Sequence, residues 1–285
     1  MESPSVDLEP LARAICEQRS LRFERPIGTG GFKEAFQVFD GSKPLALKIL
    51  KPGADPERLK REVDAIRRCA HSNINPLVDV GVCLPPNAES VYLLEGFLAG
   101  GTLSQRLRAP PLPSVAEVRQ WGLRLGAAVA YLESIDLVHR DLKPDNIMFG
   151  SDAAEPILVD FGIARHLQNT SLTPTWLSVG PGTPMFTSPE QINNQKGLID
   201  WRADQFALGV VLSVCLTGRH PYGGDSDNPG TIIENVMQRI GPSSEFLKKM
   251  KELNALCLVK LVQPWPAQRY RRPQEMPDAM QHMGA

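Results

Sequence analysis

The residues best able to do chemistry stand close together, in the segment His139-Arg140-Asp141-Leu142-Lys143-Pro144-Asp145-Asn146 and in Asp160-Phe161-Gly162. Asp141 can accept a proton, and Lys143, two positions later, can offset negative charge on a group in transfer. Asn146 and Asp160 offer the oxygen ligands that magnesium prefers. A proton acceptor, a cation and two metal ligands in this order suit the transfer of a phosphoryl group to a hydroxyl.

These side chains need a scaffold that brings the two metal ligands together. Residues 147–149 and 157–159 are short apolar runs on either side of a polar turn, which predicts a β-hairpin. Asn146 lies just before the first predicted strand, and Asp160 follows the second. We therefore expect both side chains to face one pocket.

The two motifs resemble the signature of the eukaryotic-type protein kinase family, and the resemblance extends from residue 23 to about residue 280. It implies an α+β fold with two lobes, a small β-rich lobe with one main helix and a larger, mostly helical lobe. It also implies an N-terminal extension (1–22), expected to be helical, and a kinase domain (23–285). Within that domain we expect the small lobe at about 23–94, the hinge at about 95–101 and the large lobe at about 102–285.

A glycine-rich segment near the N-terminus, Ile27-Gly28-Thr29-Gly30-Gly31, resembles the loop that covers the phosphates of ATP in this family. Glycines there let backbone N–H groups approach phosphate oxygens. The family pattern has a third glycine where Lys33 stands and a valine where Ala35 stands. The resemblance implies that Ile27, Gly28, Gly30 and Ala35 contact the nucleotide, whereas the glycines alone would indicate only a hairpin turn.

Lys48 lies in an alternating, β-prone segment, residues 45–50, which predicts a strand. By resemblance, Lys48 anchors the α and β phosphates of ATP, and Ala46 also contacts the nucleotide. A lysine in this position needs a carboxylate to hold it. Residues 56–66 have the pattern of a helix, and by resemblance Glu62 is the acid that this helix supplies.

A second β-prone run, residues 91–97, predicts another strand, after which Thr102 has the residue type of a helix N-cap. By resemblance, Leu94 is the gatekeeper residue, and the backbone of the hinge from Glu95 to Phe97 bonds adenine. The resemblance also places Met148 beneath the adenine ring.

The segment from 164 to 178 is rich in Thr, Ser, Asn and Gln, and residues 182–190 resemble the end of the family's activation segment. Its hydroxyl groups are candidate phosphorylation sites, although a plain polar loop would have the same composition. Arg140, next to the expected base, predicts regulation by a phosphate on this segment because a guanidinium binds phosphate well.

By resemblance, residues 201–209 and the apolar run that continues to Leu216 form the buried central helix of the large lobe. By resemblance, Asp204 near its start holds the catalytic loop. The resemblance also pairs Arg269 with Glu190.

Composition agrees with one cytoplasmic enzyme domain. The chain has 285 residues, 42% of them hydrophobic, and a formal net charge of −1, which gives no basic excess for nucleic acid or membrane partners. Its five cysteines are scattered without Cys-x-x-Cys spacing, so we expect reduced thiols and no zinc site. The longest apolar stretch is too short to cross a bilayer.

Near the N-terminus, Leu8, Leu11 and Ile15 share one helical face, which we expect to pack on the small lobe.

Three classes of function are compatible with these residues, and a Ser/Thr protein kinase is favoured. Lys143 sits two residues past the expected base, and Thr183 lies in the segment that would meet the substrate hydroxyl. A small-molecule kinase of the aminoglycoside or choline type typically lacks the lysine match and the segment through Glu190. A pseudokinase or binding module would normally have lost Lys48, the base or a metal ligand, and this chain keeps all three.

The resemblance therefore implies an ATP-dependent protein kinase in which Asp141 and Lys143 are catalytic. Asn146 and Asp160 would hold Mg²⁺, with Mn²⁺ as an alternative. The substrate would be a protein hydroxyl, and the enzyme would also phosphorylate its own activation segment. The short links between motifs and the ending Pro189-Glu190-Gln191 resemble bacterial members of the family. The sequence leaves the protein substrate and the oligomeric state open.

Overall fold

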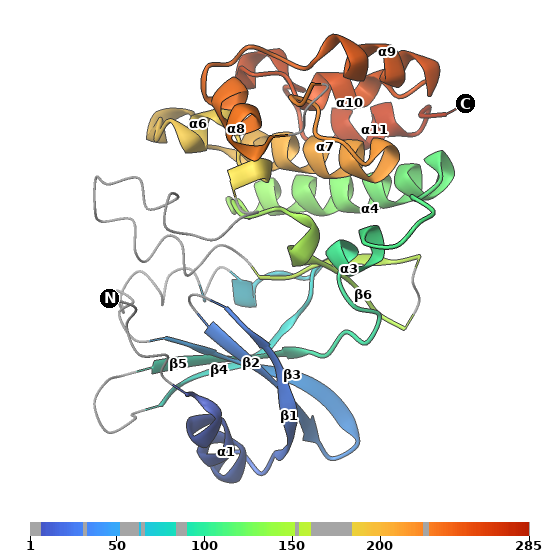
Figure 1. Ribbon diagram of the computed structural model, residues 1–285. Coiled ribbons are helices and arrows are strands. Elements are labelled where there is room, and N and C mark those ends of the chain that lie inside the picture. The colour runs from blue at the N-terminus through green and yellow to red at the C-terminus, as the bar shows by residue number, and fades with distance from the viewer. Residues whose placement is uncertain are drawn as a thin grey trace. The chain divides into compact units, whose positions relative to one another are not determined.

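The computed structural model describes residues 7–30, 33–51, 63, 66–83, 90–151, 154–160, 184–224 and 228–284 (Figure 1). These residues belong to two compact units. The first contains the described parts of Met1–Ala70 and Asn75–Phe97, and the second those of His71–Ile74, Leu98–Phe161 and Pro174–Ala285. The first unit is built on a β-sheet, whereas the second is mainly helical.

Five antiparallel strands form the sheet of the first unit, in the order β1-β2-β3-β5-β4. Their bounds are β1 (Arg22–Thr29), β2 (Lys33–Asp40), β3 (Lys43–Leu50), β4 (Leu77–Cys83) and β5 (Ser90–Gly96). The central strand β3 is buried on both faces, because every residue from Leu45 to Leu50 is buried. The two predicted strands that carry Lys48 and Glu95 are confirmed.

Helix α1 (Glu9–Gln18) covers one face of this sheet (Figure 1). Its buried residues Ala12, Ile15 and Cys16 belong to one apolar cluster with alternate residues of the strands, namely Phe36, Val38, Leu45, Leu47, Ile49, Cys83, Tyr92 and Leu94. The backbone N–H of Leu8 donates to Oε2 of Glu34, a buried carboxylate on the same face. The apolar stripe of the N-terminal segment therefore packs on the sheet of its own chain.

The second unit combines a short hairpin with several helices. The hairpin pairs β6 (Ile147–Phe149) with β7 (Pro156–Leu158), and single 3-10 turns occur at Pro144–Asn146, Pro184–Phe186, Lys196–Leu198 and Pro266–Gln268. The helices are α3 (Leu103–Leu107), α4 (Val115–Ser134), α6 (Pro189–Ile192), α7 (Trp201–Thr217), α8 (Pro229–Met237), α9 (Ser244–Glu252), α10 (Leu256–Leu261) and α11 (Glu275–Met280). As predicted, Thr102 caps α3, since its side chain accepts from the backbone N–H of Gln105. None of the helices in the described part of the chain is long and apolar enough to cross a membrane.

Helix α7 is the buried axis of the second unit. Asp200 caps its N-terminus by accepting the N–H of Arg202, and Gly218 ends it in the left-handed conformation, with φ at +69°. Helix α4 lies beside it, and α10 and α11 pack on α7 and α4 respectively (Figure 1). The predicted central helix is thus confirmed. Asp204 in this helix is buried, so its carboxylate needs hydrogen-bond donors, which the apolar side chains of the core do not provide.

A buried ion pair joins the short helix α6 to the segment that precedes α11. Arg269 donates from Nη1 to Oε1 of Glu190 at 2.6 Å and from Nη2 to Oε2 at 3.0 Å. The same guanidinium also donates to the carbonyl oxygens of Arg202 and Gln263. The pairing expected from the resemblance is confirmed, and the additional acceptors offset the desolvation of the guanidinium.

We expect Arg269→Met to lower the free energy of unfolding by about 3–5 kcal/mol, because it leaves the carboxylate of Glu190 buried without its cation. Lys249→Gln is the matched control in the same unit. Its pair with Glu252 is half exposed, so the loss should stay within about 1 kcal/mol. Urea denaturation of both variants and the parent checks this, and equal losses for the two variants would contradict it.

Candidate functional site

The segment that contains Asp141 is held by the carboxylate of Asp204 from α7. Oδ2 of Asp204 accepts the backbone N–H of His139, and Oδ1 accepts that of Arg140, both at 2.7 Å. Burial raises the pKa of the Asp204 carboxyl, whereas the nearby His139 and the two backbone donors oppose this rise. The expected role of Asp204 is therefore confirmed: a core helix fixes the backbone directly before Asp141.

Two further hydrogen bonds fix the same segment. Nε2 of the buried His139 ring bonds the carbonyl oxygen of Val159 at 3.0 Å, which ties the segment to the end of the hairpin. The side chain of Gln191 in α6 donates to the carbonyl oxygen of Arg140 at 3.0 Å. Arg140 itself has φ at +65°, a left-handed conformation that a residue other than glycine adopts only when its surroundings hold it there.

Two predicted site residues, Lys143 and Asn146, contact the carboxylate of a third, Asp141. Nζ of Lys143 lies 2.9 Å from Oδ2 of Asp141. Nδ2 of Asn146 donates to the same Oδ2 at 2.9 Å and to the carbonyl oxygen of Asp141 at 2.7 Å. The carboxylate is thus oriented by a cation and an amide, as a proton acceptor in a fixed position requires.

The hairpin expected between the two metal ligands is present, with its second strand one residue earlier than predicted. Ile147 pairs with Leu158, so that the strand ends lie side by side, and the backbone N–H of Val159 donates to the carbonyl oxygen of Asn146 at 3.0 Å. Asp160 follows directly and has φ at +60°. The backbones that carry Asn146 and Asp160 therefore lie next to each other.

The donor set of these two residues fits magnesium. Because Nδ2 of Asn146 points at Asp141, its Oδ1 is the atom that remains for a cation, and Asp160 adds a carboxylate. Mg²⁺ is usually held by one or two carboxylate or amide oxygens together with water and substrate phosphates, so two protein ligands suffice. In the described residues, no group of three or more His, Cys, Asp and Glu residues forms a separate metal site.

Met148 lies at the middle of β6, where it forms an isolated bridge with Thr102. The backbone before α3 runs beside β6, because the N–H of Gly100 donates to the carbonyl oxygen of Phe149 at 2.9 Å. A Cβ atom at Gly100 would lie 2.2 Å from the carbonyl oxygen of Gly150, so only glycine fits this close approach.

In the first unit, the sheet gathers several predicted nucleotide contacts on one face. Lys48 lies directly opposite Ala35 of β2, and Ala46 lies opposite Glu95 of β5. Since Ala46 and Lys48 are two residues apart, all four side chains belong to the same face of the sheet. It is the face opposite α1, because the alternate residues Leu45, Leu47 and Ile49 belong to the cluster under that helix.

The glycine-rich segment continues this arrangement at the edge strand β1. Gly28 pairs with Ala35, and Ile27 lies at an irregularity in the register between β1 and β2. The N–H of Gly30 donates to the carbonyl oxygen of Lys33 at 2.8 Å, which joins the residue after β1 to the first residue of β2.

Lys48 forms a buried ion pair with Glu95, in which Nζ lies 2.6 Å from Oε2. Nδ2 of Asn75 donates to the same oxygen at 3.1 Å and to the carbonyl oxygen of Gly96 at 3.0 Å. At the start of the expected hinge, the N–H of Phe97 donates to the carbonyl oxygen of Pro44 at 3.4 Å. Glu95 was predicted to act through its backbone, and the structure adds a side chain that contacts the predicted phosphate anchor.

The expected gatekeeper, Leu94, lies on the wrong face of the sheet for that role. It pairs with Leu47 and belongs to the apolar cluster under α1. Side chains alternate along a strand, so the residue that shares a face with Ala46 and Lys48 is Glu95. The prediction for Leu94 is therefore wrong by one position.

Several predictions concern residues outside the described part of the chain. They include the expected acid Glu62, Gly31 of the glycine-rich segment, Phe161, and the activation segment through Thr183. Their predicted roles stay predictions.

Sequence reasoning missed three residues that support the site. Gln191 was noted only as part of a motif ending, Asn75 was not considered, and the side chain of Glu95 was given no role. Buried polar residues are normally hydrogen-bonded. For Asn75 and Glu95, a polar position in or near a strand was the available signal, but burial cannot be read from these short segments alone. Gln191 is partly buried in helix α6 and gave no such signal.

The imidazole of His220 connects α7 to the end of the predicted activation segment. The backbone N–H of Tyr222 donates to Nδ1 at 3.1 Å, so Nε2 carries the proton and donates to the carbonyl oxygen of Met185 at 2.8 Å. Burial lowers the pKa of His220 to about 4. The ring is therefore neutral at pH 7.

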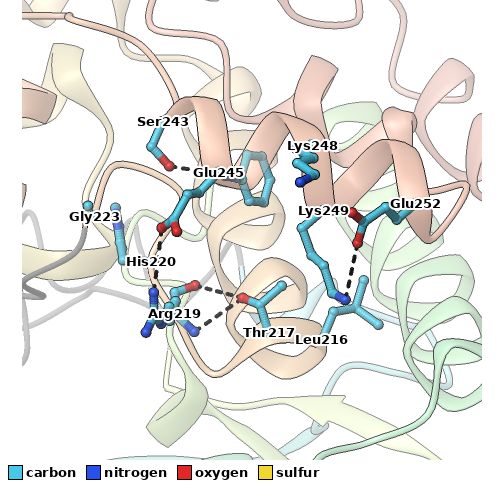
Figure 2. Close-up of a pocket in the computed structure, with 12 residues that line it drawn as sticks. Leu216, Thr217, Arg219, His220, Gly223, Ser243, Glu245, Lys248, Lys249 and Glu252 are labelled. Carbon is cyan, nitrogen blue, oxygen red and sulfur yellow. Dashed lines mark hydrogen bonds and ion pairs between the residues drawn. The ribbon is translucent and has the colours of Figure 1, made fainter.

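A surface pocket of about 410 Å³ lies between the C-terminal end of α7, the turn that follows and α9 (Figure 2). Four of its charged side chains form two pairs, Arg219 with Glu245 and Lys249 with Glu252. None of the residues predicted to perform chemistry lines this pocket.

Comparison with known proteins agrees with these motifs. Residues 21–283 match the family described as protein kinase domain. The chain is 35% identical over 210 residues to the serine/threonine-protein kinase PknD of Mycobacterium tuberculosis, an alignment that covers 71% of this chain and 30% of PknD. It is 29% identical over 267 residues to the DNA damage-responsive serine/threonine-protein kinase RqkA of Deinococcus radiodurans, covering 91% of this chain and 38% of RqkA.

A solved structure also matches, that of Rad53 in complex with AMP-PNP, with a TM-score of 0.70 at 22% identity over 96% of this chain and 69% of that chain. At this identity the likeness bears on the fold alone. The chain spans less than two fifths of the length of the two curated relatives.

The buried His220 predicts a dependence of stability on pH. Its pKa is about 4 in the folded chain and 6.5 for an ordinary histidine, so between these pH values the unfolded chain takes up a proton that the folded chain does not. We expect the free energy of unfolding to fall as the pH drops from 6.5 towards 4, by up to about 3 kcal/mol from this residue. Chemical denaturation at several pH values should show a shallower fall for His220→Gln, and equal slopes would contradict the assignment.

Proposed function

We propose that this chain, which belongs to the protein kinase family and has its α+β fold, transfers the γ-phosphate of ATP to serine or threonine hydroxyls of proteins. The observation that supports this most directly is the cluster of Asp141, Lys143 and Asn146, with contacts of 2.7–2.9 Å. The predicted membership in the family is confirmed, whereas the reaction of this particular chain is our proposal.

In this proposal, the carboxylate of Asp141 orients the substrate hydroxyl and accepts its proton. Lys143 offsets charge on the transferred phosphoryl group, and its contact with Oδ2 of Asp141 keeps its ammonium beside the reacting atoms. Such groups act by position and electrostatics, since the transferred phosphoryl needs little covalent help.

The nucleotide would be held by residues of the first unit. Lys48 would bind the α and β phosphates, and the backbone N–H groups near Gly28 and Gly30 would approach the phosphate oxygens. Ala35 and Ala46, on the same sheet face as Lys48, would pack against adenine, and the backbone between Glu95 and Phe97 would bond its edge.

Magnesium is the metal that the Asn146 and Asp160 oxygens would hold. When bound, it neutralises charge on the phosphates. Asn146 would serve twice in this arrangement, because its amide N–H groups orient Asp141 while its oxygen faces the cation. Manganese would fit the same oxygen ligands.

The alternatives are less well supported. A small-molecule kinase would not require the segment through Glu190, which is anchored here by Arg269. A scaffold without activity would not need the aligned contacts around Asp141. A protein substrate is therefore favoured, and a cytoplasmic location stays a prediction.

Asp141→Ala should lower the rate of phosphoryl transfer by about 10²–10⁴-fold, because it removes the proton acceptor. Lys48→Ala should lower kcat/KM for ATP by a comparable factor. The matched control is Asp145→Ala, which removes an exposed carboxylate from the same loop and should leave transfer within about twofold. Transfer from labelled Mg-ATP to a generic protein acceptor measures all three, and near-normal turnover of Asp141→Ala would refute the assigned role.

Autophosphorylation should occur between Thr170 and Thr183, where hydroxyl residues are dense. A phosphate there would find a cation in Arg140, whose backbone is fixed by Asp204 and Gln191. Mass spectrometry after incubation with Mg-ATP should find phosphate in this segment for the parent protein, and none for Asp141→Asn. Phosphate confined to other parts of the chain would argue against this mode of regulation.

A further inference from the structure

A carboxylate and an ammonium group share a buried place on the sheet face that carries the proposed nucleotide contacts. Glu95 is 8% exposed and Lys48 is 7% exposed, and their charged atoms lie 2.6 Å apart. A buried ammonium is costly unless a carboxylate accompanies it. Glu95 is therefore part of what allows a cation at position 48 of this strand.

The register of the sheet determines this pair. Lys48 lies opposite Leu93, and Ala46 lies opposite Glu95, so Lys48 and Glu95 are diagonal neighbours on one face. Diagonal positions of antiparallel strands are about 7–8 Å apart, which long side chains can span. The contact is made by two adjacent strands of one sheet, and it needs no separate element to be brought into place.

The side chain of Asn75 fixes the position of the Glu95 carboxylate. Its buried amide donates to Oε2 of Glu95 and, with the same nitrogen, to the carbonyl oxygen of Gly96. The amide therefore fixes both the side chain of Glu95 and the backbone next to it. A carboxylate with a fixed rotamer fixes the ammonium that it pairs with.

We propose that Glu95 is a positioning residue that holds Lys48 for the phosphates of the nucleotide, and that Asn75 holds Glu95. This inference rests on the proposed function, because it assigns Lys48 to a phosphate. An ammonium has three N–H donors, so pairing with Glu95 is compatible with a phosphate contact. The sheet thereby supplies a carboxylate for Lys48 in addition to any that the segment containing Glu62 provides.

Glu95→Gln tests this, since it keeps the shape of the side chain and removes its charge. We expect Kd for Mg-AMP-PNP, measured by calorimetry, and KM for ATP to rise by about tenfold or more. The KM for a protein acceptor should stay within about twofold. Glu34→Gln is the matched control: Glu34 is 9% exposed and lies in the same sheet on the face under α1, so its loss should leave Kd within about twofold.

A double-mutant cycle separates positioning from a general loss of structure. In a Lys48→Met background, Glu95→Gln should change Kd for Mg-AMP-PNP by less than about twofold, because Glu95 acts through Lys48. If Glu95→Gln fails to fold, Asn75→Ala replaces it, with an expected rise in Kd of about threefold. The proposal is overturned if the variant binds like the parent, if the effect persists without Lys48, or if only Glu62→Gln weakens binding.

The calorimetric measurement does not depend on catalysis. A parent protein that binds Mg-AMP-PNP in a Lys48-dependent way but phosphorylates no protein would refute the proposed function, while the comparison of Glu95 variants would still decide this inference. A parent protein that binds no nucleotide would overturn both.

Discussion

The arrangement of the segment that contains Asp141 depends on one buried carboxylate, that of Asp204. It accepts the backbone N–H groups of His139 and Arg140, and Arg140 stands in a left-handed conformation that costs about 1–3 kcal/mol for a residue other than glycine. The free energy of two short hydrogen bonds to a carboxylate is large enough to offset this conformational cost. Because Asp204 belongs to the buried helix α7, the core of the second unit fixes the backbone directly before Asp141, and the hydrogen bonds of His139 and Gln191 add to this.

The parts of the site that lie close in sequence could be predicted from pattern. The apolar runs on either side of a polar turn were sufficient to predict the hairpin between Asn146 and Asp160, whereas α7 was predicted through the resemblance. The pairing of Glu190 with Arg269 could not be obtained in this way, because 79 residues separate them and no periodicity links them. It was predicted only because the whole motif order resembles a family. The resemblance gave no role to Gln191, although its side chain in α6 donates to the carbonyl oxygen of Arg140.

The error at Leu94 has a physical cause. In a strand with one solvent-exposed face, the alternation of apolar and polar residues indicates which side chains point inward. In β5, Leu93 and Leu94 are both buried, since one faces the Lys48 side and the other lies under α1. The sequence therefore carries no alternation from which to read the face, and a shift of one residue reverses every assignment. The residue that follows, Glu95, is the only charged residue of β5, and its pairing with Lys48 depends on the register of β3 against β5.

Two buried ion pairs in the described part of the chain differ in a way that bears on their roles. Glu190 and Arg269 have side chains that are 0% exposed, and two parallel hydrogen bonds join them, so nothing from solvent can replace either partner. Lys48 and Glu95 have side chains that are 9% and 11% exposed, and one contact of 2.6 Å joins them. A pair that is fully enclosed and bidentate can act only on the structure. A pair joined by one contact and not fully enclosed is compatible with an ammonium that also meets an anion while the carboxylate keeps it in place, which is what our proposal for Lys48 requires.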